Sequence, residues 1–403
     1  MNMKKVFLTS FLIFAVFAQL INVNAADSED ISYKIELLGS FIPAVTVTDE
    51  NGNETETTVN SRTWSIDIKQ TDKKIYAYIA NKLGLFVYDV TNIDEAIKVQ
   101  HVPELAGQGL LTVSGNKLYY AYADELLYCF DINDNGTVSI EKDNNGKITN
   151  PSYGGNIDMM ISIDNYVFAY RNYLEILVFD SSGENPAVAV NSIGERAKYK
   201  RQMAVKQVSG TLYRISYIQQ SGSDFELICT DYNSSDNASI EVVHEVIPEW
   251  TENRFGKMAF VTDSKIAVAN KLSNTREMLY TVDFSDYYNN EIADEYKKTV
   301  CGVFGQSHNT AVYASNMQRL NENELALWNK ASFVKTFASG AQINLGSSSV
   351  LEAVTDAKDF AVFGDTASEF TDYLACDGMV IAVKIARKIK QKQEVERPVI
   401  INN

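Results

Sequence analysis

One short apolar segment that ends in aspartate recurs along this chain: GLFVYDV at 84–90, LLYCFDI at 126–132, EILVFDS at 175–181, ELICTDY at 226–232 and MLYTVDF at 278–284. The aspartates, Asp89, Asp131, Asp180, Asp231 and Asp283, are separated by 42, 49, 51 and 52 residues. Such a period is typical of repeats in which each unit forms one four-stranded sheet. The recurrence therefore predicts a repeat architecture made of strands.

Each segment is preceded by another apolar strand, such as KKIYAYIAN at 73–81. A further strand comes before this pair, such as 64–69, and is expected innermost in the unit. A fourth strand follows the pair, such as 97–102, and is expected outermost. The outer strand of the second unit is expected at 138–142. Alternating apolar residues bounded by Asn, Asp, Gly and Ser are typical of strands joined by turns.

Two later units keep the strand pair without the aspartate. We expect the first pair at 310–316 and 324–330, with Asn329 in place of the aspartate, and the second at 359–365 and 379–385, with Lys384 in that place. Four strands in each of seven units predict an all-β chain that folds as a seven-bladed β-propeller, with six or eight blades as the alternatives.

A ring of blades must close, because an open end would expose a long unpaired strand edge. The segment at 31–41 is expected to pair beside 379–385, and the tail at 394–401 is the alternative closing strand. Residues 44–60 are typical of a hairpin that turns at Asn51-Gly52. The chain is thus predicted to be a single propeller domain, 26–403, closed by strands from its two ends, with this hairpin as an insertion.

The N-terminus has the pattern of a cleavable signal peptide at 1–25. Lys4 and Lys5 precede an apolar run at 6–21, and small residues up to Ala25 fit a cleavage site. The run is short for a membrane span, and an uncleaved anchor is the alternative. We therefore predict a secreted, periplasmic or cell-surface protein without a transmembrane segment in the mature chain.

The chain is acidic, with a formal net charge of −16 that becomes −18 once the two N-terminal lysines are removed. Nucleic acid and anionic membranes are therefore poor partners. Cys129 and Cys229 precede repeat aspartates in separate units, so both are predicted to be core residues and not a disulfide. A bridge between Cys301 and Cys376 stays open.

The segment at 83–133, LGLFVYDVTNIDEAIKVQHVPELAGQGLLTVSGNKLYYAYADELLYCFDIND, resembles the LVIVD repeat proteins, a group of exported propellers. The similarity is good over 83–133, fair up to Asp283 and poor beyond it. It implies a propeller outside the cytoplasm, and it brings no catalytic residues.

A calcium loop is one interpretation of DINDNGTVS at 131–139. Oxygen-bearing side chains occupy its positions 1, 3, 5 and 9, and Gly136 lies at position 6; the candidate ligands are Asp131, Asn133, Asn135, Ser139 and Glu141. Position 12 is Lys142, where a bidentate acid belongs, and a tight Asn-Gly turn would use the same residues without a metal. Calcium is the one cofactor that the sequence suggests.

The repeat aspartates are expected to be structural, because an Asp side chain can accept backbone N–H bonds and start the following turn. Of the three histidines, His101 and His244 are expected on outer strands far from each other, and His308 in a loop that could approach the central channel. No zinc spacing, phosphate loop or nucleophile elbow is present. These observations favour a non-enzymatic protein.

Ligand-binding residues are expected on the face that carries the loops within strand pairs and the connections between blades. Aromatic rings and arginines there can stack on a sugar or hold a peptide. The candidates are Trp250, Arg254, Tyr153, Arg171 and Tyr199. The alternative role for Trp250 is packing between blades.

The sequence therefore predicts an exported, monomeric binding or scaffold module for a protein or carbohydrate partner at the cell envelope. The alternative is an extracytoplasmic hydrolase or lyase with a shallow site on the same face. An enzyme would show clustered carboxylates with separated pKa values, and a scaffold a broad aromatic surface.

Overall fold

The computed structural model describes residues 20–22, 31–58, 61–122, 126–149, 153–171, 174–194, 199–246, 255–260, 262–273, 276–288, 297–305, 316–321, 324–329, 332–337, 342–344, 359–365, 369–376 and 378–389. As predicted, this part of the chain is almost entirely β-structure. Its short helical elements are η2 (Ile93–Glu95), η3 (Pro103–Leu105) and α1 (Ser285–Tyr288).

The strands form antiparallel sheets of four, each listed here from its innermost strand outward. They are β5 (Thr63–Gln70), β6 (Ile75–Asn81), β7 (Gly84–Asp89) and β8 (Ile97–Val102); β9 (Gly109–Ser114), β10 (Lys117–Tyr122), β11 (Leu126–Asp131) and β12 (Tyr153–Gly154); β13 (Ile157–Ile163), β14 (Tyr166–Arg171), β15 (Ile176–Asp180) and β16 (Ala189–Ile193). Next come β17 (Tyr199–Ser209), β18 (Leu212–Ser221), β19 (Asp224–Asn233) and β20 (Ala238–Val246); β21 (Phe255–Phe260), β22 (Lys265–Ser273), β23 (Arg276–Asp283) and β24 (Lys297–Gly305); β25 (Asn316–Asn321), β26 (Glu324–Asn329), β27 (Ser332–Phe337) and β28 (Gln342–Asn344).

One sheet joins segments from opposite ends of the chain. It contains β29 (Asp359–Asp365), β30 (Glu369–Cys376), β31 (Met379–Ile389), β2 (Ile31–Phe41) and β1 (Leu20–Asn22). β2 pairs antiparallel with β31 over its whole length, from Ile31 opposite Ile389 to Phe41 opposite Val380. The edge that a ring would leave open is paired here.

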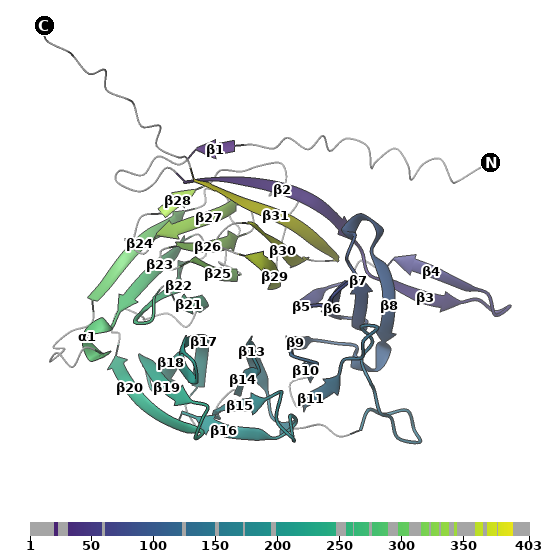
Figure 1. Ribbon diagram of the computed structural model, residues 1–403, viewed down its shortest axis with the longest axis horizontal. Helices are drawn as coiled ribbons and strands as arrows, with labels where there is room; N and C mark the ends of the chain where they lie inside the picture. Colours follow the sequence, from purple (N-terminus) through teal and green to yellow (C-terminus); the bar gives the residue numbers. More distant parts are fainter. Residues whose placement is uncertain are drawn as a thin grey trace, which may run out of the picture.

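The sheets stand in a ring around a common centre (Figure 1). Their innermost strands contact one another in chain order, from β29 through β5, β9, β13, β17 and β21 to β25. The hairpin of β3 (Ala44–Thr48) and β4 (Glu54–Thr58) projects outward beside β8 (Figure 1). Lys98 on β8 holds it, with Nζ 2.5 Å from the Glu56 carboxylate.

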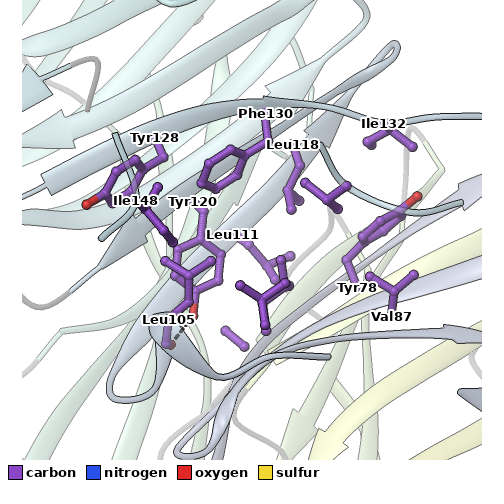
Figure 2. Packing of buried hydrophobic residues seen from close by; sticks show 14 of the residues in the cluster. Tyr78, Val87, Leu105, Leu111, Leu118, Tyr120, Tyr128, Phe130, Ile132 and Ile148 are labelled. Carbon is purple, nitrogen blue, oxygen red and sulfur yellow. Dashed lines mark hydrogen bonds between the residues drawn. The ribbon is translucent and has the colours of Figure 1, made fainter. Parts of the chain in front are cut away.

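The core is layered between neighbouring sheets. Between the first two sheets after the hairpin, aromatic and branched side chains from both pack together, among them Tyr78, Tyr120 and Phe130 (Figure 2). The buried phenols have partners: the Tyr78 hydroxyl donates to the Gly136 carbonyl at 3.0 Å, and the Tyr120 hydroxyl to the Leu105 carbonyl at 3.2 Å. The polar ends of these rings are thus satisfied within the core.

The structural role of the repeat aspartates is confirmed in three sheets. The backbone N–H two residues further along donates to the aspartate Oδ1: Thr91 to Asp89, Ser182 to Asp180 and Ser285 to Asp283, at distances of 3.1, 2.9 and 3.1 Å. Four of the aspartates also pair with a cation that lies in, or directly before, the preceding strand: Asp89 with Lys74, Asp131 with Lys117, Asp231 with Arg214 and Asp283 with Lys265. Asp89 and Asp283 make both kinds of contact and therefore tie a strand pair to the turn that follows it.

The outer strand expected at 138–142 is not formed, and β12 is the outermost strand of that sheet. Val138 and Lys142 make only isolated bridges to Ile132 and Ile148. The reason is local, because tight turns closed by Gly136 and Gly146, each with positive φ, fold the segment back on itself.

The two units without the aspartate are also arranged differently from the prediction. β26 is the second strand of its sheet, and its inner neighbour is β25, where a loop was expected. Residues 310–315 lie outside the described residues. β29 is innermost, and β30 occupies the loop expected at 365–377. Without the aspartate the sequence had no marker for strand position, so Asn329 does not stand where the repeat aspartate does.

Within the described ranges, no helix is long and apolar enough to cross a membrane.

Candidate functional site

Three of the five predicted ligand-binding residues lie at the same end of their sheets. Arg171 is paired with Ile157 at the start of β13, Tyr199 with Gln220 near the end of β18, and Tyr153 with Leu127 at the start of β11. We call this end, where second strands turn into third strands, the loop face. Trp250 and Arg254 lie outside the described residues, as do the side chains of Tyr153 and Tyr199. Arg171 is the candidate whose side chain can be examined.

Arg171 is held firmly at the loop face. Its Nη1 donates to Glu175 Oε1 at 3.0 Å, and the two side chains are only 16% and 5% exposed. Its Nε is buried and has no hydrogen-bond partner within the described residues. The guanidinium lies against Gly155, where φ is +115° and an added Cβ would be 2.8 Å from Nη2. The backbone conformation therefore favours glycine at this position, and any larger residue would have to displace the Arg171 guanidinium.

A pocket of about 100 Å³ opens beside Gly155. It is lined by Gln108, Leu110, Ala121, Tyr122, Leu126, Gly155, Asn156, Ile157 and Asp158. Its polar groups are two amides, one phenol and one carboxylate, which can donate to and accept from a polar ligand. This small site lies on the face that the sequence predicted, and it contains residues that the sequence did not single out.

A larger cavity of about 560 Å³ occupies the centre of the ring. It is lined by Met159, Met160, Ile161, Ser162, Ile163, Met203, Ala204, Val205, Lys206, Gln207, Met258, Ala259, Phe260, Asp359 and Phe360. A third cavity of about 70 Å³ adjoins it, sharing Met159, Met160 and Asp359, and extends to Trp64, Ser65 and Asp158. Leu110 and Asp158 also line the loop-face pocket, so the small cavity shares lining residues with each of the other two.

Two carboxylates near these cavities link innermost strands. Asp359 Oδ2 accepts from Ser65 Oγ at 2.6 Å and from the Ile66 N–H at 3.1 Å. Asp67 Oδ2 accepts from the Val113 N–H at 2.7 Å and from Thr112 Oγ1 at 3.1 Å. Burial raises the pKa of Asp67 to about 6 against these hydrogen bonds, and the negative charge of Asp359 adds to the shift.

No protein-family model matches the chain, and no curated protein has a similar sequence. Solved structures do resemble it. The N-terminal domain of Nup159 has 11% identical residues and a TM-score of 0.53, with 91% of this chain and 98% of that domain covered. The Nup133 β-propeller domain of Vanderwaltozyma polyspora has 12% identity and a TM-score of 0.50, with coverages of 92% and 100%. A chain of the mitotic checkpoint complex has 8% identity and a TM-score of 0.51, with coverages of 94% and 100%.

This chain is a β-propeller. The likeness extends over most of its length and concerns the fold alone, because the sequences share so few residues.

A second recurring residue was not among the predicted site residues. Glu125, Glu175, Glu226 and Glu277 lie five or six positions before a repeat aspartate in the sequence. Two of these are described in full, and both are buried, Glu175 at 4% exposure and Glu226 at 8%. Glu226 accepts from Gln219 Nε2 at 2.6 Å, as Glu175 does from Arg171. The recurring glutamate was the available signal, and in two blades it supplies a buried acid near the loop face.

The predicted calcium ligands lie at the end of β11 and in the segment that leads from it to β12, the outermost strand of the same sheet, and several of their side chains contact residues of this segment. Asn135 Oδ1 accepts from the backbone and hydroxyl of Thr137, and Ser139 Oγ donates to Asn133 Oδ1 at 3.2 Å. Asp131 pairs with Lys117. In the parts of the chain that the structure describes, no group of three or more His, Cys, Asp or Glu residues is placed to hold a metal.

The histidines are separate, as expected for the two that are described. His101 stacks on Phe86 with ring centroids 4.2 Å apart, and its Nε2 is 2.9 Å from the Leu83 carbonyl. His244 lies between Glu226 and Glu241, at 3.3 and 3.0 Å. His308 lies outside the described residues.

Proposed function

We propose that this protein is an exported, monomeric, seven-bladed β-propeller that serves as a non-enzymatic binding or scaffold module for a protein or glycan partner at the cell envelope. The blade number is supported by counting as one blade each sheet of four or five strands in the described residues. The resemblance to LVIVD repeat proteins supports the same architecture. Solved propellers such as those of the mitotic checkpoint complex belong to protein assemblies, which favours a binding role.

Export is supported by the N-terminal pattern and by one feature of the closing sheet. β1 lies within the predicted signal peptide and gives that sheet a fifth strand. Removal of residues 1–25 would leave four strands, the number found in the other large sheets. Mass spectrometry of the mature protein tests this directly, because a chain that begins at Ala26 supports the proposal and an intact N-terminus contradicts it.

The observation that carries the binding role is the loop-face pocket. Gln108, Tyr122 and Asn156 offer an aromatic ring and amides, and Arg171 is fixed beside them by Glu175 and Gly155. Hydrogen-bonding groups around an aromatic ring suit sugar hydroxyls or a peptide backbone. The Arg171 side chain is already held by Glu175, so a partner that contacts it would lose little entropy in ordering that side chain.

The test is a binding screen with residues 26–403. Neutral oligosaccharides are examined by thermal shift and calorimetry, and envelope extracts by pull-down, each with wild type and with Tyr122→Ala. We expect one class to bind wild type and to bind Tyr122→Ala at least about tenfold more weakly. Equal binding by both proteins would contradict a site at this pocket.

A hydrolase or lyase is the second candidate, and the raised pKa of Asp67 close to Asp359 is the observation that favours it. The hydrogen bonds argue against catalysis, because both carboxylates accept from a neighbouring strand and thereby connect two blades. The test is hydrolysis or cleavage of a panel of polysaccharides by wild type and by Asp67→Asn. Activity that is lost in a folded Asp67→Asn variant would support the enzyme.

A further inference from the structure

We propose that the central cavity of the propeller binds a primary ammonium group carried on an apolar chain, as presented by an alkylamine or by a lysine side chain between apolar residues. This inference concerns a site other than the loop-face pocket. It rests on the size of the cavity, its apolar lining and the charges at its ends.

The volume and lining fit a small organic ligand. A cavity of about 560 Å³ is in the range of ligand sites, which are mostly apolar with a few polar groups. Four methionines line it, and Met159 and Met160 are only partly buried. Methionine side chains adapt to ligands of irregular shape. These apolar side chains are partly exposed to water. Covering them with a hydrocarbon chain removes apolar surface from water, which favours binding.

The charges indicate which end group such a ligand carries. At the loop-face end, Asp359 lines the cavity and Asp158 lines the adjoining small cavity, which shares Asp359, Met159 and Met160. Lys206 is the cation of the lining, and it is paired with Asp263. The end near Asp158 and Asp359 thus carries two carboxylates, and a carboxylate attracts an ammonium and repels another carboxylate.

Calorimetry with n-octylamine, octanoate and 1-octanol tests the inference, because the three ligands share a chain and differ in end-group charge. Tryptophan fluorescence is a second readout, since Trp64 lines the small cavity. We expect octylamine to bind at least about tenfold more tightly than either of the others. A second arm with the peptide acetyl-Leu-Lys-Leu-amide distinguishes the sources: comparable binding assigns the site to a lysine side chain, and binding of octylamine alone assigns it to a small amine.

Two variants and one control localise the effect. Asp158→Asn removes a charge at an exposed position and should weaken octylamine binding about fivefold. Met160 lines both the central cavity and the small cavity, so Met160→Lys brings a cation between them and should abolish octylamine binding. The fold of this variant is checked by circular dichroism. Asp72→Asn makes the same charge change in the exposed turn after β5 and should change nothing.

Two outcomes would overturn the inference. One is octanol binding as tightly as octylamine, and the other is no detectable binding of octylamine at millimolar concentration. Neither would affect the loop-face proposal, because its test uses Tyr122, which lines neither the central cavity nor the small cavity, and Met160 does not line the loop-face pocket; Asp158 lines that pocket too, so Asp158→Asn does not serve to separate the two proposals.

Discussion

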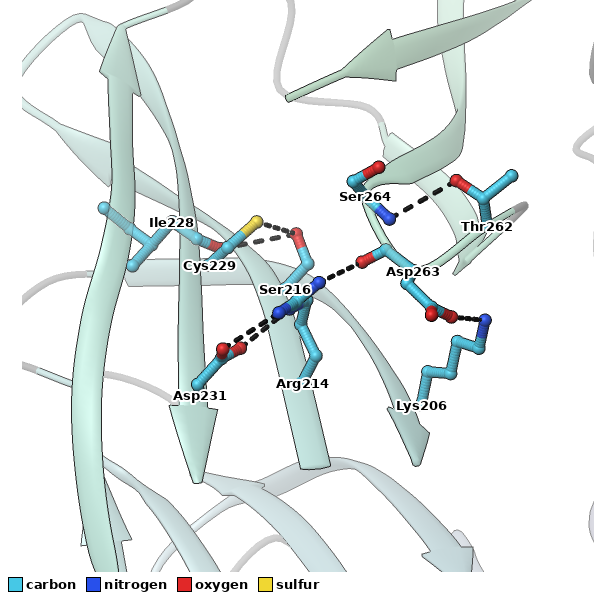
Figure 3. Close-up of polar contacts among 9 residues, drawn as sticks. All are labelled: Lys206, Arg214, Ser216, Ile228, Cys229, Asp231, Thr262, Asp263 and Ser264. Carbon is cyan, nitrogen blue, oxygen red and sulfur yellow. Dashed lines mark hydrogen bonds and ion pairs between the residues drawn. The ribbon is translucent and has the colours of Figure 1, made fainter. Parts of the chain in front are cut away.

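Arg214 and Asp231 face each other across β18 and β19 as a parallel, two-bond ion pair. Nε donates to Oδ1 at 2.7 Å and Nη2 to Oδ2 at 2.9 Å, and Nη1 donates to the Asp263 carbonyl before the next blade's second strand (Figure 3). The side chains are 6% and 17% exposed. One arginine thus links a strand pair to the neighbouring blade.

Replacing Arg214 with alanine is expected to destabilise the fold by about 3 kcal/mol, because it removes both guanidinium hydrogen bonds from the largely buried Asp231 carboxylate and the bond to the Asp263 carbonyl. The matched control is Lys117→Ala, since Lys117 and Asp131 occupy the equivalent cross-strand positions in another blade. Asp131 is 64% exposed, so the control should cost less than about 1 kcal/mol. Urea unfolding measures both, and equal losses would contradict the proposed role of burial.

Asp89 is expected to make the propeller sensitive to acid. Burial alone would raise its pKa, but hydrogen bonds from Lys74 and Thr91 outweigh burial and hold the pKa below its usual value of 3.8. A lowered pKa in the folded state stabilises the protein above the unfolded-state pKa, and that stability is lost as the pH falls through the folded-state pKa. Between about pH 5 and pH 3, wild type should therefore lose stability faster than Asp89→Asn. If the unfolding free energies of the two proteins fell in parallel with pH, the Asp89 carboxylate would not contribute to the acid sensitivity.

Asp67 is expected to affect the pH dependence of stability in the opposite direction to Asp89. Its folded-state pKa of about 6 is above the usual 3.8, so its contribution to stability is fully present below the unfolded-state pKa and is lost as the pH rises through about 6. Asp67→Asn should flatten the decline in unfolding free energy between about pH 4 and pH 6. Asparagine cannot replace both carboxylate oxygens as acceptors, so the variant will also differ in absolute stability. The quantity to compare is therefore the slope of the unfolding free energy against pH. An unchanged slope would contradict the raised pKa.

Gly155→Ala is expected to displace the Arg171 guanidinium and destabilise the protein by about 1–3 kcal/mol. Gly146→Ala is the control, because Gly146 also has a positive φ but an added Cβ there meets nothing within 4 Å. That variant should lose about 1 kcal/mol from backbone strain alone. Denaturant unfolding separates the two costs, and equal values would mean that the contact with Arg171 is unimportant.

Calcium is expected to leave the thermal midpoint of chelator-treated protein unchanged, because the oxygens of Asn133 and Asn135 already accept hydrogen bonds within the turn. Binding would have to replace those bonds. A rise in the midpoint that disappears in Asp131→Ala would instead establish the metal loop predicted from the sequence.

The repeated segment carried enough information to predict the class of fold and the local role of its aspartate. Alternating apolar residues define strands, and Asp89, Asp180 and Asp283 start turns through bonds to residues only two positions away. Such short-range patterns depend on neighbouring residues, so they can be read from the chain alone. Where the aspartate is missing, as in β26 and β29, strand positions were misassigned.

Tertiary structure decided everything that depends on residues distant in the chain. The bond from Ser65 to Asp359 joins positions 294 residues apart, and the central cavity takes its lining from four separate strands. The contact of Arg171 with Gly155 likewise depends on how β13 and β14 pair. The sequence alone determined an all-β repeat protein of acidic character. Which side chains share a pocket was settled only when the sheets closed around a common centre, because that arrangement sets the distances between blades.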